Sequence, residues 1–341
     1  MSWLKNASGN GSPKTWCQMS LIRKQWFLIV LLLALAGGYF FAGQLGGLVA
    51  ASWLKWTVVA VTMFLMAWPL EFGKLYGALA KPLAPFLATG VNFVLIPLLA
   101  WPISKLLGAD LGSGLIVAAA VPSTLASGAV WTRRAGGDDS VAVVVTLLTN
   151  STCFFVTPLL VYLMLGGRVE PGTFQQTIFK LLYFVVLPMA LGQIVRVHKP
   201  TAAWATRNKP KLSTAAMFGV LFMVLVGSAV AGQKVAESES SISIGQILMM
   251  TVAVAVVHLV GWAAGFYLAG QCNIPRDRQI AVAFSGSQKT LMAGLSTAIS
   301  MGLNIIPMVA YHAVQLIIDT VLADRLKANS TEPNMPNEPN E

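Results

Sequence analysis

The stretch AVAFSGSQKTLMAGLSTAIS, residues 281–300, decides how this chain folds. A helix needs about 20 mostly apolar residues to cross a bilayer, and this stretch has that length with a single charge, on Lys289. A cation near the bilayer centre costs about 2.5–3.5 kcal/mol even on the gentler insertion scales. A partner charge, a water-filled cavity or a bound anion must offset that cost. Gln288 and Thr290 flank the lysine and Gly286 lies close by, so the stretch indicates a transport site at membrane depth.

The composition places the rest of the chain in the membrane as well. Of the 341 residues, 56% are hydrophobic and 11% charged, and the mean hydropathy is +0.69, whereas soluble domains carry about 25% charged residues. The net charge of +10 would suggest nucleic acid in a soluble protein. Here the basic residues gather in loops, as the positive-inside rule demands. The expected partner is therefore the lipid bilayer, with no nucleic acid.

The chain shows no pattern of an enzyme or of a bound metal cluster. The three cysteines and three histidines are scattered without metal-ligand spacing. We find no Walker motif, no HExxH and no acid pair with catalytic spacing. We therefore expect neither catalysis nor a cofactor, and the sequence does not indicate the oligomeric state.

Recurring apolar runs predict an all-α membrane protein with ten transmembrane helices. The runs lie at about 26–43, 52–70, 84–106, 111–132, 139–165, 173–195, 212–232, 244–270, 279–301 and 305–325. Of the 23 lysines and arginines, 17 fall on one side of this arrangement, five on the other and Lys289 inside the membrane. That bias predicts cytoplasmic termini and a plasma (inner) membrane location. The longest internal cytoplasmic loop is predicted at 198–212.

Outside the ten-helix domain, 21–327, we predict two polar, disordered tails, 1–20 and 328–341. Met19 is an alternative start to Met1, because the apolar pattern begins only after it. Ten helices divide into two halves of five, about 21–168 and 169–327. An odd number in each half makes the second half insert upside down, which gives the inverted repeat common among secondary transporters.

The fourth helix of each half is interrupted, and this pairing points to a midplane site. In the first half Pro122 falls mid-span, where it removes a backbone donor, and polar residues follow at Ser123, Thr124 and Ser127. In the second half the matching depth holds Ser287, Gln288, Lys289 and Thr290. The alternative for the first interruption, taken alone, is a purely structural kink.

Two further helices carry polar faces. Thr146 and Asn150 are four residues apart, so they share one face; their oxygens could ligate a cation or a substrate hydroxyl, or could simply join helices. His312, Gln315 and Asp319 form one face of the last helix. For Asp319 two readings stay open: a pair with Lys289, or a place in the cytoplasmic vestibule beside Arg325 or without a partner. We favour the vestibule.

Several stretches together resemble the bile acid:sodium symporter superfamily, solute carrier family 10, and most of all its member-seven-like branch. They are VPSTLASGAVWTRRAGGDDSVAVVVTLLTN, TPLLVYLMLG, LPMALGQIVR, AVAFSGSQKTLMAG and YHAVQLIIDTVLA, in this order. The resemblance runs from about Trp26 to Lys327. It implies a panel domain and a core domain with crossed, discontinuous fourth and ninth helices, and sodium-coupled uptake of organic anions by alternating access. By motif position it implies sodium ligands at Ser127, Thr146 and Gln288.

The chain departs from that family pattern at three positions. Phe284 stands where better-known members carry a glutamate, Gly128 replaces an asparagine, and Lys289 replaces a small polar residue. A buried lysine repels sodium or replaces it, and it also gives up its proton more readily than an exposed one. Either Na+ or H+ is therefore the expected coupling ion, if there is one. The leading hypothesis is a symporter-like secondary transporter of a small organic anion; the alternative is a non-transporting membrane regulator of ion homeostasis that acts through partners.

Overall fold

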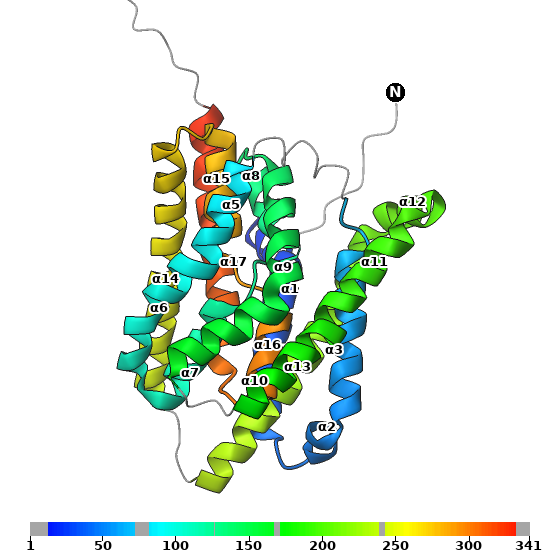
Figure 1. The fold of residues 1–341 in the computed structure, drawn as a ribbon, viewed down its shortest axis with the longest axis vertical. Helices are drawn as coiled ribbons and strands as arrows, with labels where there is room; N and C mark the ends of the chain where they lie inside the picture. Colours follow the sequence, from blue (N-terminus) through cyan, green and yellow to red (C-terminus); the bar gives the residue numbers. More distant parts are fainter. Residues whose placement is uncertain (1–12, 72–81, 126, 167–170, 239–242, 332–341) are drawn as a thin grey trace, which may run out of the picture.

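In the computed structural model the described residues are 13–71, 82–125, 127–166, 171–238 and 243–331, and every regular element among them is helical (Figure 1). The all-α class predicted from the apolar pattern is therefore confirmed for the described residues. In chain order the elements are α1 Pro13–Phe40, α2 Gly46–Ala50, α3 Ser52–Ala67, α5 Leu83–Gly90, the π turn η2 Val91–Leu95, α6 Ile96–Ser104, the 3-10 turn η3 Lys105–Leu107, α7 Gly108–Ala120, α8 Ser127–Arg134, α9 Asp139–Leu165, α10 Pro171–Leu181, the π turn η4 Leu182–Val186, α11 Leu187–Val197, α12 Lys199–Arg207, α13 Lys209–Ser238, α14 Ile244–Gln271, α15 Arg276–Ser287, α16 Leu291–Ser300 and α17 Ile306–Thr331.

Six helical stretches of the described part are long and apolar enough to cross a membrane. They are Leu83–Ala120, Asp139–Leu165, Gly172–Val197, Lys209–Gln233, Ile244–Gln271 and Ile306–Lys327. Two apolar helices, Ile29–Phe40 and Ser52–Ala67, are shorter. Length alone does not test the predicted count of ten, because interrupted segments such as α15 and α16 are too short singly. The ten spans and the inverted repeat stay predictions.

Three predicted boundaries differ from the structure. The predicted loop 198–212 contains the helix α12, which Pro200 opens near its first position, where proline is preorganised for a helix. The predicted tail 1–20 overlaps α1, which begins at Pro13. At the other end α17 continues to Thr331. Residues 1–12 and 332–341 of the two predicted tails lie outside the described residues.

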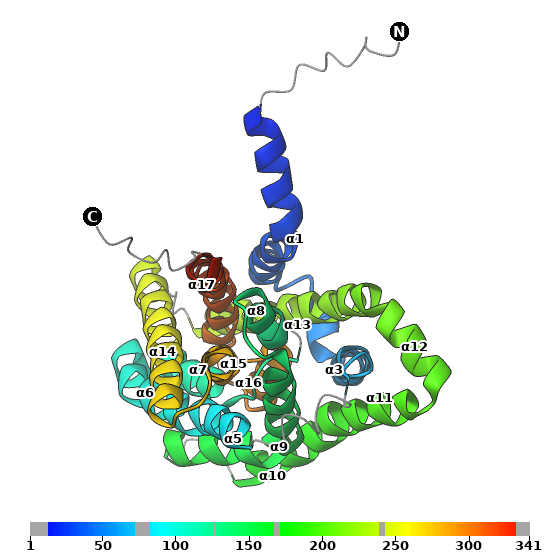
Figure 2. The same ribbon diagram turned by 90° about the horizontal axis from the view of Figure 1, so that it is seen from above.

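The helices pack in two groups. One contains α1, α3, α11 and α13, together with α10, which continues into α11 through η4 and also packs against α9. Figure 2 shows α3 between α11 and α13, which α12 joins. The other contains α5 to α9, α14, α15 and α17, with α15 packed against α14, α5 and α9. Helix α16 contacts α17 and α7 of the second group and α13 and α10 of the first. It therefore lies where the two groups meet.

Large apolar side chains cover the outside of the molecule. Leu33, Phe40, Trp53, Leu106 and Ile244 are each more than half exposed. Such a surface suits lipid, since a soluble monomer rarely exposes so much apolar area. Inside, small residues allow close helix contacts: a Cβ at Gly38 of α1 would lie 2.3 Å from the carbonyl oxygen of Leu225 on α13.

Candidate functional site

Two helix interruptions meet inside the second group of helices. One lies between the end of α7 at Ala120 and the start of α8 at Ser127, and the other between the end of α15 at Ser287 and the start of α16 at Leu291. Both are where the sequence predicted them. A main-chain hydrogen bond of 2.9 Å from the Thr290 N–H to the Pro122 carbonyl joins the two.

The first interruption has a donor for each of five consecutive carbonyls. The donors are side chains of α9 and groups of the second interruption: Thr157 Oγ1 to Ala120, Lys289 Nζ to Val121, Thr290 N to Pro122, Asn150 Nδ2 to Ser123 and Thr146 Oγ1 to Thr124. An unpaired carbonyl in the membrane interior costs several kcal/mol. The predicted polar face of Thr146 and Asn150 is thus what allows the backbone to leave the helix here.

The second interruption is supplied in the same way from other elements. Its five carbonyls accept from Ser123 Oγ at Ser285, Asn92 Nδ2 at both Gly286 and Gln288, Tyr311 Oη at Ser287 and Gln315 Nε2 at Lys289. Gln315 also accepts from the Lys289 N–H at 2.9 Å, so one amide of α17 holds both backbone groups of the lysine.

The Lys289 ammonium is fully enclosed and bound to backbone oxygen. Lys289 has no exposed surface, and its Nζ donates to the carbonyls of Asn92 at 2.6 Å and Val121 at 3.0 Å. Val121 follows the C-terminus of α7, where the helix dipole favours a cation. Asn92 belongs to the π turn η2, a distortion often found at functional sites. The Phe93 ring centroid lies 6.0 Å from Nζ.

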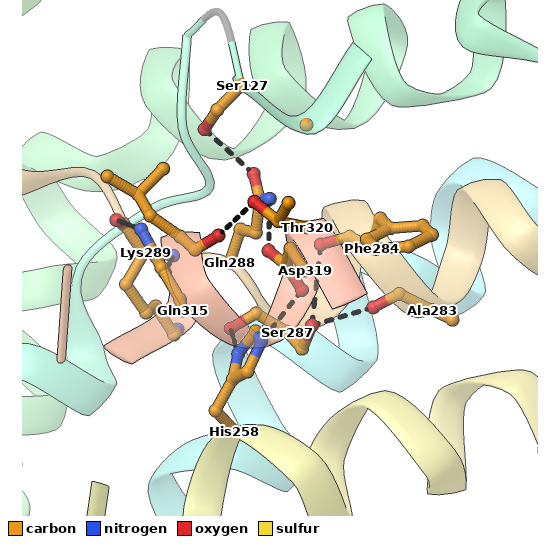
Figure 3. A network of polar contacts seen from close by, with 12 residues as sticks. Ser127, His258, Ala283, Phe284, Ser287, Gln288, Lys289, Gln315, Asp319 and Thr320 are labelled. Atoms are coloured by element: carbon orange, nitrogen blue, oxygen red, sulfur yellow. Dashed lines mark hydrogen bonds and ion pairs between the residues drawn. The ribbon is translucent and has the colours of Figure 1, made fainter. Parts of the chain in front are cut away.

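Three neutral oxygens gather between the interruptions, around Gln288. Gln288 Oε1 accepts from Thr124 Oγ1 at 2.7 Å and from Ser127 Oγ at 3.0 Å, and the two hydroxyls lie 2.8 Å apart. Figure 3 shows the contact between Ser127 and Gln288. Of the predicted sodium ligands, Ser127 and Gln288 are thus in direct contact. Thr146 lies one step away, since its hydroxyl donates to the Thr124 carbonyl.

One oxygen beside this cluster has no hydrogen bond. Asn150 Oδ1 is buried and lacks a partner among the described residues. Its amide orientation is fixed, because Nδ2 donates to the carbonyls of Ser123 and Thr146, both at 2.8 Å. A buried acceptor without a donor is unusual, and it suits a cation. Asn150 is one of the two residues of α9 whose oxygens the sequence predicts as candidate ligands of a cation or a substrate hydroxyl, and this oxygen is available for one.

Both readings of Asp319 are wrong. The side chain is fully buried rather than in a vestibule, and it binds neither Lys289 nor Arg325 among the contacts of the described residues. Its oxygens accept from Gln288 Nε2 at 2.5 Å and contact His258 Nε2 at 2.9 Å. The histidine that contacts Asp319 comes from the neighbouring helix α14, and not from α17 itself. A chain of contacts thus runs from Ser127 through Gln288 and Asp319 to His258 (Figure 3).

Sequence reasoning missed His258. His258 is fully buried, and its Nδ1 lies 3.3 Å from the Ser287 carbonyl. The same kind of sequence pattern that marked Lys289 could have marked His258, since it is the one histidine in the apolar span 244–271. His312 is half-buried; it contacts Gln315, which binds the Lys289 backbone, at 2.9 Å, and packs its ring against Phe27.

Comparison with known proteins decides the family. The SBF-like CPA transporter family matches residues 25–328. The chain belongs to the SBF-like CPA transporter family. It is 29% identical over 248 residues to "Uncharacterized protein PA2026" of Pseudomonas aeruginosa, which covers 70% of this chain and 73% of that one. It is 26% identical over 251 residues to "Putative symporter YfeH" of Escherichia coli, covering 71% and 74%. With "Sodium/bile acid cotransporter 7" of Danio rerio it shares 23% identity over 325 residues, covering 90% and 94%.

The family assignment confirms the resemblance seen in the sequence and makes the chain an integral membrane protein of a transporter family. The structure also explains two departures from the expected pattern. Phe284 is fully buried and packs edge-on against Trp262, with 5.7 Å between ring centroids. At Gly128 a Cβ would lie 3.4 Å from Gln288 Oε1, so Gln288 fills the space of a longer side chain. Among the described residues, the carboxylate that contacts Gln288 comes from Asp319 instead.

Proposed function

We propose that this protein is a secondary transporter that moves a small organic anion across the plasma (inner) membrane by alternating access. The observation that carries the proposal is the hydrogen bond from Thr290 to Pro122 between two interrupted segments, beside the fully buried Gln288 and Lys289. Paired interruptions of this kind mark midplane sites in secondary transporters. Two relatives, one named as a putative symporter and the other as a cotransporter, support the same function.

In this proposal the two groups of helices are the panel and the core, and their relative motion gives alternating access. The ten predicted spans form two inverted repeats, and both termini are cytoplasmic. The crossing belongs to the core, where its hydrogen bonds keep the two interruptions together as a unit. Helix α16 connects that unit to the other group, since it contacts α13 and α10.

Lys289 acts as a tethered cation. Its ammonium already has two carbonyl acceptors and no exposed surface, so it needs no bound anion to offset its charge. Broken helices at membrane depth often use such free carbonyls to hold a cation. The lysine therefore replaces one coupling ion, and the substrate anion binds elsewhere.

A second, exchangeable cation binds on the other side of Gln288. For Na+ the ligands are neutral oxygens, those of Ser127, Thr146 and Gln288 with Asn150 Oδ1. For H+ the acceptor is the Asp319 carboxylate. In both cases Asp319 supplies the negative charge, and the Lys289 charge balances it when the cation leaves. The two ions differ in which gradient drives uptake.

Purified protein in liposomes tests the proposal. A thermal-shift screen of organic anions, with and without sodium and across pH, first selects the anion that stabilises the protein most. Uptake of that anion is then measured under a sodium gradient, a pH gradient, or neither. We expect uptake above that of empty liposomes under one cation gradient. If no stabilising anion enters under any gradient, the protein is not a transporter, and the regulator hypothesis replaces this proposal.

A further inference from the structure

A cavity lies at the end of α16 remote from the crossing, between the two groups of helices. Its volume is about 110 Å3. Helix α3 contributes one wall, α10 and α13 contribute two more, and α16, which lies where the two groups meet, closes it. The lining residues are Ser52, Lys55, Trp56, Lys180, Met223, Ser296, Ile299 and Ser300.

Two positive charges face this cavity without a negative one. Neither Lys55 nor Lys180 forms an ion pair with a described residue, and no lining residue is acidic. Both lysines line the same cavity, so their like charges repel each other. Lys55 Nζ donates to the Val49 carbonyl at 2.6 Å, and Lys180 Nζ donates a long hydrogen bond of 3.4 Å to Ser300 Oγ. Like charges in a half-buried site are unfavourable unless an anion neutralises them.

The remaining wall is suited to a short carbon chain with polar ends. Trp56 and Ile299 are apolar, while the hydroxyls of Ser296 and Ser300 can donate to oxygen. A single water needs roughly 10–15 Å3 of such space. At about 110 Å3, the cavity is therefore larger than one water needs and has room for a small organic ligand.

We infer that this cavity binds the substrate of the transporter, and that the substrate is a small dianion of the dicarboxylate class. The inference rests on the proposed function, and it assigns the anion to Lys55 and Lys180 rather than to Lys289. One carboxylate binds each ammonium group, as charge-assisted hydrogen bonds favour. The short chain between them lies against Trp56.

The same position connects the anion to the crossing. Ser300 ends α16, and Thr290 directly precedes that helix. Ten residues of helix span about 15 Å. A dianion bound by lysines of α3 and α10 and by hydroxyls of α16 holds the two groups of helices together. Its release frees α16, whose other end carries the Lys289 interruption.

Calorimetry on the full-length protein in nanodiscs of zwitterionic lipid tests the assignment. Three probes of one size differ only in charge at neutral pH: succinate with two charges, succinamate with one and succinamide with none. We expect succinate to bind more tightly than succinamate, and succinamide to give no heat. Equal affinities for all three, or no heat from succinate in the millimolar range, would overturn the inference.

Variants then locate the site. We expect Lys55→Gln and Lys180→Gln each to weaken succinate binding at least about tenfold, the effect of losing roughly 1.4 kcal/mol, and Lys180→Arg to retain most of it. Lys105→Gln is the matched control, because Lys105 lies over the Trp101 ring and outside the cavity; it should bind like the wild type. An unchanged affinity in both Lys55→Gln and Lys180→Gln contradicts the assignment, whatever their stability.

Flux separates this inference from the proposed function. If the lysine variants lose succinate binding but wild-type liposomes carry no anion under any gradient, the anion site stands and the transporter proposal fails. If wild-type liposomes take up an anion and Lys55→Gln and Lys180→Gln take it up equally well, the transporter stands and this site fails.

Discussion

Both helix interruptions, between α7 and α8 and between α15 and α16, leave backbone carbonyls without a partner in their own helix. Different donors satisfy these carbonyls in the two places. Each exposes five consecutive carbonyls, and each carbonyl accepts a hydrogen bond. Neutral groups serve the second interruption entirely. The first includes one charged donor, Lys289, which comes from the second. The charge is thus part of the link between the two interruptions, and predictions can test each donor separately.

The largest effect among the bridging side chains should follow from Gln288→Leu. Gln288 contacts Thr124, Ser127 and Asp319 at once, so the variant removes a side chain of the second interruption that contacts both the first interruption and the carboxylate. We expect anion uptake in liposomes to fall about tenfold to a hundredfold, equivalent to about 1.4–2.8 kcal/mol. Uptake at the wild-type rate would show that the bridge is not used.

Asp319→Asn should have the next largest effect, and it distinguishes the two coupling ions. The amide keeps the shape of the side chain but removes the charge and the proton acceptor. If H+ is the coupling ion, the pH dependence of uptake disappears in the variant. If Na+ is the coupling ion, uptake falls and needs a higher sodium concentration, because the negative charge near Gln288 is lost. A variant with unchanged rate, pH dependence and sodium dependence would exclude Asp319 from coupling.

Thr146→Val tests the neutral donors of the first interruption. The substitution keeps the side-chain shape and leaves the Thr124 carbonyl without the hydroxyl that now donates at 2.8 Å. An unsatisfied buried group costs about 1–3 kcal/mol, so the apparent melting temperature in detergent should fall. Thr152→Val is the control, since its hydroxyl bonds only within α9 and should change stability less.

Tyr311→Phe tests the second interruption and should have the smallest effect. The phenol donates to the Ser287 carbonyl at 3.1 Å, but His258 Nδ1 lies 3.3 Å from the same oxygen. Because a second group is available, we expect a loss of less than about 1 kcal/mol, below that of Thr146→Val. The reverse order of melting temperatures would mean that His258 does not donate to this carbonyl.

The sequence predicted the places of both interruptions, because Pro122 and Lys289 each break an otherwise apolar helical pattern. It also predicted that Thr146, Asn150 and Gln315 lie on polar faces, and the structure shows what those faces meet. Spacing along one helix is enough for such predictions.

The partners of Lys289 and Asp319 could not be predicted in this way. The lysine binds backbone carbonyls, which every residue has and no motif marks. Asp319 meets His258, 61 positions away along the chain, because α14 packs against α17. Which helices become neighbours depends on packing across the whole molecule. The helix α12 in the predicted loop 198–212 was missed for a simpler reason: the stretch is short and rich in basic residues, so it was interpreted as a loop.

Anion uptake by Lys289→Met in liposomes tests whether Lys289 acts as a tethered cation during transport. Methionine keeps the length of the side chain, removes the charge and leaves the carbonyls of Asn92 and Val121 without their donor. The matched control is Lys105→Met, which lies outside the crossing. We predict that the Lys289 variant, if folded by size-exclusion chromatography, loses uptake or changes the cation on which uptake depends, while the control does neither. Unchanged uptake with unchanged cation dependence in Lys289→Met would contradict it.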